Sequence, residues 1–292
     1  MYDLIIIGMG VSGISASIYA HRAGMKVLLL EGSAPGGTVN SISEIENYPG
    51  ISKISGPDLA YNLFEEVNIL GIEYKLEKVT DVILEDIKRV KTTNNVYEAK
   101  YLLIASGRRP KMLGLKNEEK FFGKGISTCA LCDGALYKNS DVAVIGGGSS
   151  ALSEALYLSN IVNKVYLIHR RDEFRGEDTL IREVKEKGNI ELILNNEAQE
   201  LVIEDNVLKG IMLKDGKKID IKGIFIYVGF IPNTDFLEST DIKREDGYIL
   251  VDEHHETNIK GVYASGDVLK KEIYQIINAA SEGAEAVIYM TR

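Results

Sequence analysis

The fold is decided at the start of the chain, where the run Asp3-Leu-Ile-Ile-Ile7 leads directly into Gly8-Met-Gly10-Val-Ser-Gly13. The run is short, rich in isoleucine and ended by glycine, which predicts a buried strand. Val11 to Ala23 then has the pattern of a helix, and Val27-Leu-Leu-Leu-Glu31 that of a second buried strand. A strand, a helix and a strand in this order predict a parallel sheet covered by helices, and therefore an α/β fold.

The glycines of this segment fit the G-x-G-x-x-G fingerprint of a dinucleotide-binding turn. Gly8 permits the tight turn, Gly10 lets a pyrophosphate approach the backbone, and Gly13 lets helix and strand pack closely. Glu31 ends the next strand, 23 residues after Gly8, where an acid binds a ribose diol. A ribose without a 2′-phosphate is the kind that FAD has. We therefore expect FAD to be bound by Gly8, Gly10, Ser12, Gly13 and Glu31. The alternative is a purely structural turn.

The same pattern restarts at Asp141. It predicts a strand over Val142–Ile145, the turn Gly146-Gly147-Gly148-Ser149-Ser150-Ala151, a helix to about Leu158 and a strand over Val165–His169. Each of the two units is followed by a stretch rich in β-branched residues. The chain therefore repeats one plan at the scale of a domain.

A basic cluster stands where the first unit has its acid, because His169-Arg170-Arg171 begins 23 residues after Gly146 and Arg175 follows one helical turn later. An acid would repel a ribose 2′-phosphate, whereas arginine can hold one with two parallel hydrogen bonds. The second site therefore suits NADPH; the alternative is a solvated run of charge. The residues expected to bind NADPH are Gly146, Gly148, Ser149, Ser150, His169, Arg170, Arg171 and Arg175.

Two meanders are expected between and after these units. Residues 72–105 predict a small antiparallel meander followed by a return strand over Tyr101–Ala105. A second meander is expected from about Ile190 to Gly229, with turns near Asp205-Asn206 and Asp215-Gly216.

The chain has 292 residues, with 34 Lys and Arg against 43 Asp and Glu and a net charge of −9. This length predicts about two domains, and the lack of a basic excess argues against a nucleic-acid partner. Residues 4–20 are uncharged but interrupted by glycines, and no segment reaches the roughly 20 apolar residues of a membrane helix. We therefore expect a cytoplasmic protein with no membrane partner.

The chain has two cysteines, both in Cys129-Ala-Leu-Cys132, which excludes a secreted fold stapled by many disulfides. The spacing is typical of a redox or metal site. Zinc would need further ligands from four scattered histidines, and a pair of inert buried thiols is a second alternative. The third is a reversible disulfide, for which Asp133 could donate and recover the proton unless it is only a turn residue.

The order of an FAD fingerprint, a C-x-x-C-D-G motif and a basic fingerprint resembles the low-molecular-weight, bacterial-type thioredoxin reductases, which are class II pyridine nucleotide-disulfide oxidoreductases. The resemblance covers essentially the whole chain. It departs from the usual pattern at Val11-Ser12, Thr38, Leu131 and Ser149. Further stretches that look like flavin motifs of this family are Glu31 to Thr38, Glu46 to Gly50, Ser106 to Pro110, Tyr263 to Val268 and Gln275 to Gly283.

This resemblance implies two Rossmann-like domains of three layers (ββα), with the NADPH domain inserted into the FAD domain. The FAD domain would comprise residues 1–110 and 235–292, and the NADPH domain residues 111–234, with crossings near Arg109–Lys111 and Pro232–Asp235. Further FAD-binding residues implied by the resemblance are Gly36, Gly37, Thr38, Asn47, Ser106, Gly107, Gly266, Asp267, Gln275 and Ile276.

The activity implied is that of a thioredoxin-disulfide reductase in a homodimer. Electrons would pass from NADPH to FAD, then to the Cys129–Cys132 disulfide, and then to thioredoxin. Cys132 would face the flavin, Cys129 would attack the substrate disulfide, and Asp133 would act as acid and base. The alternatives are a related reductase with ferredoxin as donor or with another disulfide acceptor, and a non-catalytic flavin redox sensor.

Overall fold

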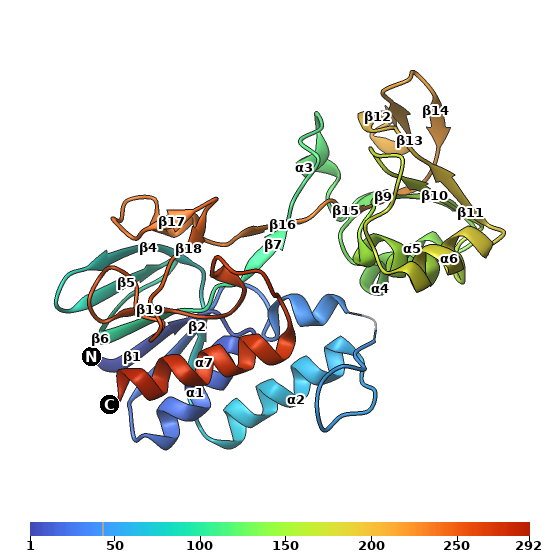
Figure 1. The fold of residues 1–292 in the computed structure, drawn as a ribbon. Coiled ribbons are helices and arrows are strands. Elements are labelled where there is room, and N and C mark those ends of the chain that lie inside the picture. The colour runs from blue at the N-terminus through green and yellow to red at the C-terminus, as the bar shows by residue number, and fades with distance from the viewer. Residues whose placement is uncertain (43) are drawn as a thin grey trace. The chain divides into compact units, whose positions relative to one another are not determined.

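A computed structural model describes residues 1–42 and 44–292 (Figure 1). The chain divides into two compact units, of which the first combines Met1–Arg109 with Ile231–Arg292 and the second is Pro110–Phe230. The second unit is thus inserted into the first. The expected boundary after residue 110 lies one residue beyond the first division, and the boundary after residue 234 lies four residues beyond the second.

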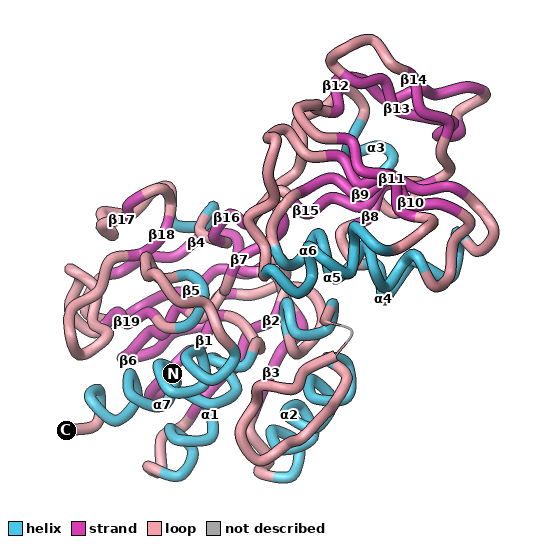
Figure 2. Tube along the Cα trace, turned by 45° about the vertical axis from the view of Figure 1, so that its right-hand side comes forward, coloured by secondary structure: helices cyan, strands magenta, loops and turns pink. Residues whose placement is uncertain are grey.

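The first unit is built on five parallel strands in the order β3-β2-β1-β6-β19. The meander β4-β5-β6 covers one face of this sheet and three helices cover the other (Figure 2). The strands are β1 (Tyr2–Ile7), β2 (Val27–Glu31), β3 (Glu73–Leu76), β4 (Val79–Leu84), β5 (Lys88–Thr92), β6 (Val96–Ile104) and β19 (Val262–Ala264). The helices are α1 (Val11–Arg22), α2 (Gly56–Ile69) and α7 (Ile276–Met290), and a small ribbon is made by β17 (Arg244–Glu245) and β18 (Tyr248–Ile249).

Strand β1 shows why its sequence is apolar on both faces. Leu4 and Ile6 pack among residues of α1, α2 and α7, whereas Ile5 and Ile7 pack against the meander. All four side chains are buried. Because successive side chains of a strand point to opposite faces, a strand between two layers must be apolar at every position. The unbroken run at the start of the chain is therefore the signature of the central layer.

The second unit repeats the plan with the parallel order β11-β10-β9-β15-β8. Helices α5 and α6 cover one face and the meander β12-β13-β14 covers the other (Figure 2). The strands are β8 (Ile126–Ser127), β9 (Asp141–Gly146), β10 (Lys164–Ile168), β11 (Ile190–Ile193), β12 (Ala198–Glu204), β13 (Val207–Leu213), β14 (Lys218–Asp220) and β15 (Gly223–Tyr227). The helices are α3 (Glu118–Phe121), α4 (Ala130–Asp133), α5 (Ser149–Ser159) and α6 (Asp178–Glu186).

The two predicted meanders form, but with different limits. Strand β3 pairs in parallel with β2, and β11 with β10, so both belong to the central sheets. The predicted return strand over Tyr101–Ala105 is not separate, because β6 pairs with β5 at its start and with β1 at its end. The predicted turns are confirmed at Asp205 and Asn206, which have positive φ, and at Gly216.

The two crossings between the units pair with each other as β7 (Arg108–Pro110) and β16 (Phe230–Pro232). Side chains beside them join the two segments of the first unit. The Ser106 hydroxyl donates to the Asn233 carbonyl at 2.7 Å, and the Arg109 guanidinium donates to the Asn233 side chain at 2.9 Å. Among the residues described, no helix is both long and apolar enough to cross a membrane.

Candidate functional site

The first glycine turn has the backbone conformation that its sequence predicts. Gly8 has a φ of +107°, and a Cβ there would lie 2.3 Å from the carbonyl oxygen of Ala105. A Cβ on Gly13 would lie 1.9 Å from the carbonyl oxygen of Gly8. By contrast, a Cβ on Gly10 would meet nothing within 4 Å. Gly8 and Gly13 are therefore required by packing, whereas Gly10 leaves open space beside the backbone, as a pyrophosphate site needs.

Alanine substitutions should separate these two requirements. Gly13→Ala forces a methyl group into the Gly8 carbonyl and should lower the free energy of unfolding by about 1–3 kcal/mol. Gly10 is in an extended conformation that any residue adopts, so Gly10→Ala should change stability by less than about 0.5 kcal/mol but reduce flavin binding. The measurements are urea denaturation of the apoprotein and the flavin content of the purified protein. Full flavin retention by Gly10→Ala would refute this role.

Glu31 lies beside this turn, as the spacing predicts. Its Oε2 accepts the Met9 backbone N–H at 2.8 Å, and its Oε1 accepts the Ser33 N–H at 2.8 Å. Gly36 also joins the turn, because its N–H donates to the Met9 carbonyl at 2.7 Å. Each carboxylate oxygen keeps a further lone pair, so Glu31 can accept ribose hydroxyls while these backbone bonds hold it in place.

The start of α1 meets the C-terminal motif. The Ser12 and Ser265 hydroxyls are hydrogen-bonded at 2.7 Å and buried, and a Cβ on Gly266 would lie 2.8 Å from the Ser12 Cβ. Gly283 of α7 packs as closely, since its Cβ would lie 2.1 Å from the Ser12 carbonyl oxygen. Two motifs that lie more than 250 residues apart in the sequence therefore pack against each other beside the first glycine turn.

Asp267 follows this contact and lies in a charged group. Its carboxylate is 3.0 Å from Arg108 Nε and 3.8 Å from Lys271 Nζ. Lys271 also pairs with Glu282 at 2.8 Å, and Glu282 accepts the Gly266 N–H at 2.9 Å. The network fixes the backbone of the Gly266-Asp267 turn. Gly107 is joined to the same region, because its carbonyl accepts the Asn233 N–H at 3.0 Å.

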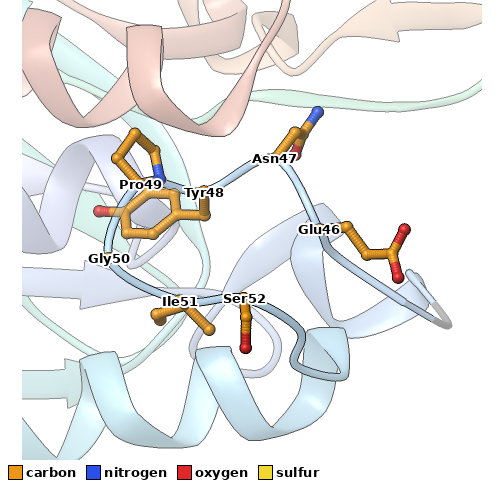
Figure 3. A pocket seen from close by; sticks show the side chains of 7 residues that line it. All are labelled: Glu46, Asn47, Tyr48, Pro49, Gly50, Ile51 and Ser52. Carbon is orange, nitrogen blue, oxygen red and sulfur yellow. The ribbon is translucent and has the colours of Figure 1, made fainter.

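The second flavin-like stretch forms a loop with a pocket, lined by Glu46, Asn47, Tyr48, Pro49, Gly50, Ile51 and Ser52 (Figure 3). Asn47 reaches the start of α7, where its Nδ2 donates to Gln275 Oε1 at 3.3 Å. Ile276 is the first residue of α7, and Thr38 lies in the 3₁₀ turn Gly37–Ser41. The structure thus brings Asn47 and Gln275 together from segments 228 residues apart.

The second glycine turn repeats the geometry of the first. A Cβ on Gly146 would lie 2.4 Å from the Tyr227 carbonyl oxygen, whereas a Cβ on Gly148 would meet nothing within 4 Å. Ser149 and Ser150 open α5 directly after it. The Ser149 hydroxyl accepts the Glu177 N–H at 3.2 Å, which ties this turn to the segment after the basic cluster.

The basic cluster contains two kinds of side chain. Arg170, Arg171 and Arg175 are exposed, and the Arg175 N–H donates to the Gly147 carbonyl at 2.7 Å, which holds it at the turn. His169 is instead 5% exposed and lies under Gly147, whose Cβ would be 2.3 Å from the imidazole. Burial lowers the pKa of His169, so its imidazole is neutral at pH 7. The positive charge expected of the cluster therefore comes from the arginines alone.

His169 Nε2 is buried and has no hydrogen-bond partner within the described part of the chain. Its ring stacks on Phe174 with centroids 5.6 Å apart. A buried polar atom without a partner is uncommon in a folded protein, so it indicates a site whose remaining partner comes from outside the chain. Together with the open face of Gly148 and the exposed arginines, it fits a nucleotide that carries a 2′-phosphate.

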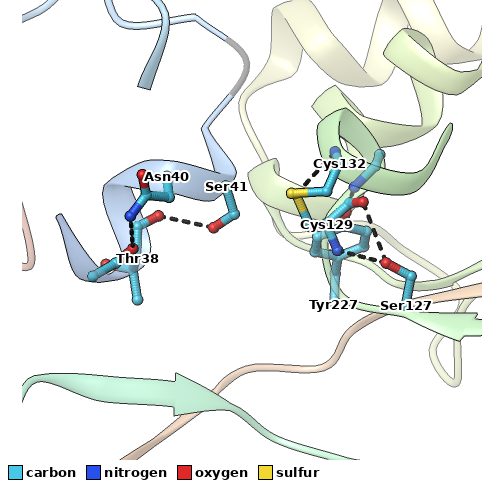
Figure 4. The surroundings of a disulfide bond; sticks show 9 residues. Thr38, Asn40, Ser41, Ser127, Cys129, Cys132 and Tyr227 are labelled. Atoms are coloured by element: carbon cyan, nitrogen blue, oxygen red, sulfur yellow. Dashed lines mark hydrogen bonds between the residues drawn. A yellow bond between two sulfur atoms is a disulfide. The ribbon is translucent and has the colours of Figure 1, made fainter. Parts of the chain in front are cut away.

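Cys129 and Cys132 are joined in a disulfide at the short helix α4 (Figure 4). Neither sulfur is therefore a free thiol or a thiolate ligand in this structure. Cys129 caps the helix, since its Sγ accepts the Cys132 N–H at 3.1 Å. Ser127 supports the loop by accepting the Cys129 N–H at 3.0 Å. Cys132 is exposed and Cys129 is half-buried.

Asp133 lies at the end of α4, close to two tyrosines. Its negative charge contributes to the raised pKa of both Tyr137 and Tyr227, although burial is the largest cause in each. Asp133 itself is half-buried, and its N–H donates to the Cys129 carbonyl at 3.2 Å. It is therefore placed within one helical turn of both sulfurs.

The sequence motifs did not point to Tyr227 or Ser127. The Tyr227 hydroxyl accepts the Ala130 N–H at 2.9 Å across 97 residues of chain. No spacing rule links two such positions. A weak signal lies in the end of β15, because the carboxyl end of a parallel strand beside a glycine turn is where ligand-facing residues gather.

Comparison with known proteins gives consistent results. A family model described as pyridine nucleotide-disulphide oxidoreductase matches residues 2–283. The thioredoxin reductase of Listeria innocua is 37% identical over 98% of this chain and 92% of its own length, and that of Bacillus subtilis is 35% identical over the same shares. A crystal structure of Lactococcus lactis thioredoxin reductase superimposes with a TM-score of 0.92 at 37% identity, covering 99% of this chain and 97% of the other. The chain therefore belongs to the pyridine nucleotide-disulphide oxidoreductase family, and within it to the thioredoxin reductases.

Proposed function

We propose that the protein is a thioredoxin-disulfide reductase, which takes electrons from NADPH and reduces the disulfide of thioredoxin. The observation that carries this proposal is the Cys129–Cys132 disulfide, which lies in the same unit as the basic nucleotide turn. A nucleotide site in the same chain gives this pair of cysteines a source of electrons. Named relatives of nearly equal length support thioredoxin as the acceptor.

The two units divide the binding of the two cofactors in this proposal. Residues 1–110 and 235–292 form the FAD domain, and residues 111–234 form the NADPH domain. The support is that the turn with the acid lies in the first unit and the turn with the arginines in the second. FAD bound in the first unit supplies the step that converts a hydride donor into a donor to a disulfide.

In the FAD domain, Gly10 gives the pyrophosphate room beside the backbone, and Glu31 accepts the ribose hydroxyls. Asp267 and Gln275 hold the remainder of the cofactor from the C-terminal segment. The contacts described above support this assignment. The full set of residues proposed to bind FAD is Gly8, Gly10, Ser12, Gly13, Glu31, Gly36, Gly37, Thr38, Asn47, Ser106, Gly107, Gly266, Asp267, Gln275 and Ile276.

In the NADPH domain, Arg170, Arg171 and Arg175 bind the 2′-phosphate, and His169 Nε2 makes a hydrogen bond to the nucleotide. Gly146, Gly148, Ser149 and Ser150 place the start of α5 against its phosphates. The exposure of the arginines and the unpartnered nitrogen of His169 support these roles. Phosphate recognition of this kind separates NADPH from NADH.

The reduced cysteine pair transfers its electrons by thiol–disulfide exchange. The Cys129 thiolate attacks one sulfur of the thioredoxin disulfide, which forms a mixed disulfide and releases the other thioredoxin sulfur as a thiolate. The Cys132 thiolate then attacks Cys129 Sγ, which restores the intramolecular disulfide and releases the second thiolate. Asp133 delivers protons to the departing sulfurs. The Cys132 N–H supports a thiolate on Cys129, because it already donates to that sulfur.

The test is an anaerobic titration with NADPH followed by the addition of thioredoxin. NADPH should bleach the flavin absorbance, and oxidised thioredoxin should restore it while its own thiols appear. A flavin that responds to reduced ferredoxin but not to NADPH would indicate the ferredoxin-dependent alternative. Bleaching without any transfer to thioredoxin would indicate another acceptor, and no bleaching by either donor would indicate a redox sensor.

We also propose that the protein acts as a homodimer in the cytoplasm. The candidate for the interface is the apolar, glycine- and alanine-rich α7, and the alternative is that this helix only packs on the flavin. Sedimentation velocity of the flavin-loaded protein decides between a dimer and a monomer. A cysteine pair that is reduced and reoxidised in each catalytic cycle is consistent with a reducing compartment.

A further inference from the structure

A buried carboxyl group lies on α5, in the same unit as the disulfide. Glu154 is 9% exposed, and its Oε2 has no hydrogen-bond partner among the residues that the structure describes. Ala151 and Leu158, which lie on the same face of this helix, and the adjacent Ala155 are fully buried and apolar. A carboxylate at such a position is costly unless it has a function or a partner. The turn and the basic cluster do not use this side chain.

The Tyr227 hydroxyl connects this carboxyl to the disulfide. It accepts the Ala130 N–H at 2.9 Å, and the Tyr227 side chain packs against the buried residues of α5, the helix that carries Glu154. Because a phenol has one proton and its oxygen already accepts from Ala130, that proton is free to be donated to Glu154. Ala130 is fully buried and follows Cys129 directly, so its amide belongs to the loop that the disulfide closes. The chain of contacts runs from α5 through β15 to α4.

We propose that Glu154 and Tyr227 are positioning residues that set the midpoint potential of the Cys129–Cys132 couple. Tyr227 clamps the Ala130 amide through the hydrogen bond between them, and Glu154 controls the strength of this clamp. The clamp is present in the disulfide form seen here. Reduction separates the two sulfurs and relaxes the loop between them, so a group that holds the loop in its disulfide conformation favours the oxidised state.

The protonation of Glu154 makes this balance dependent on pH. Burial raises the pKa of Glu154 from its ordinary value of 4.5 to about 7, and the neighbouring Tyr227 hydroxyl acts in the opposite direction. Tyr227 on β15 is the titratable group that acts on Glu154, and Asp133 on α4 acts in turn on Tyr227. The other elements packed against α5 affect the pKa of Glu154 only by burying its carboxyl group. The carboxyl is therefore neutral in acid and ionised in mild alkali.

Ionisation of Glu154 has two effects on the midpoint potential of the couple, and both lower it. A charged Glu154 makes the Tyr227 oxygen a stronger acceptor for the Ala130 N–H, which tightens the clamp. Its negative charge also opposes the formation of a thiolate on either cysteine. Both effects favour the disulfide. As the pH rises through about 7, the midpoint potential of the wild-type couple should therefore fall more steeply than it does below that pH.

The test is the midpoint potential of the couple between pH 5.5 and about 8.5, in dithiothreitol buffers, where the protein disulfide and the reduced reagent exchange two electrons and two protons. Thiol labelling reports on this couple alone, because the chain has two cysteines. Glu154→Gln keeps an acceptor for Tyr227 but cannot ionise. It should match the wild type below pH 6 and lose the break near pH 7.

Tyr227→Phe removes the clamp and should make the disulfide about tenfold easier to reduce at every pH, which is about 30 mV for a two-electron couple. Tyr166→Phe, on β10 of the same unit, is the matched control and should leave the potential unchanged. Thermal melting shows whether each variant is folded, and the wild-type pH profile remains a test that needs no variant. Parallel profiles for the wild type and Glu154→Gln, or an unchanged potential in Tyr227→Phe, would overturn the proposal.

This inference rests on the proposed use of Cys129 and Cys132 as a redox couple. The potentials are measured on the flavin-loaded protein without thioredoxin. A failure to reduce thioredoxin would therefore refute the proposed function and leave the measured potentials valid. Conversely, a normal turnover with thioredoxin and a profile without a break would refute only the role of Glu154.

Discussion

Cys129→Ser and Cys132→Ser are each expected to lower kcat/KM for thioredoxin reduction by at least about a thousandfold, because exchange needs one sulfur to attack and the other to resolve. The double variant should be no worse than either single one, since residues that act as a unit do not contribute additively. Stopped-flow absorbance and a thioredoxin thiol assay measure the two halves of the reaction separately.

Flavin reduction by NADPH is the internal control in each cysteine variant. It should proceed at a rate close to that of the wild type, because neither sulfur belongs to the nucleotide turns. Ser127→Ala is a matched control for the loop, since it removes the two hydrogen bonds of the Ser127 hydroxyl to the Cys129 N–H and carbonyl and leaves both sulfurs. If either single cysteine variant kept full thioredoxin turnover, the proposed path of electrons would be wrong.

The second large effect is expected from Arg170→Ala combined with Arg171→Ala. Hydrogen bonds to a charged group contribute about 1.5–3 kcal/mol each, and these exposed side chains justify the lower value. Losing two such hydrogen bonds therefore weakens the free energy of NADPH binding by about 3 kcal/mol, which is roughly a hundredfold in apparent affinity. The KM for NADH should change little, because NADH has no 2′-phosphate.

Lys209→Ala removes a positive charge from an exposed position on β13 in the same unit, and serves as the control for net charge. It should leave both KM values unchanged. The effect of the double variant should weaken as the ionic strength rises, since salt screens exposed charges. An unchanged preference for NADPH over NADH in the double variant would remove the basis for the assignment of the second nucleotide.

The sequence predicted the α/β class and the membership of a reductase family, and both are confirmed by the comparisons. The physical reason is that the deciding features are local. A glycine turn, an apolar strand between two layers and the hairpin turns at Asn206 and Gly216 each leave a pattern within a few residues. The roles of the individual binding residues stay predictions, because no bound cofactor tests them.

Other features could not be read from short segments. Strand β3 is largely polar and exposed, so nothing in its four residues shows that it joins the central sheet beside β2. Strand β6 changes partner along its length, which depends on residues far away in the chain. The histidine next to the arginines looked like part of a positive cluster, and only its burial under Gly147 shows that it is neutral.

The interrupted first unit has a consequence for the order of events during synthesis. Residues 110–230 leave the ribosome as a continuous segment, so the inserted unit can complete its core before Ile231–Arg292 exist. The first unit must wait for α7, because Gly283 packs on Ser12 at the very turn that is proposed to hold the flavin. The nascent chain is thus expected to be able to bind a nicotinamide nucleotide before it can bind the flavin. Binding of the flavin would then be the last step of folding.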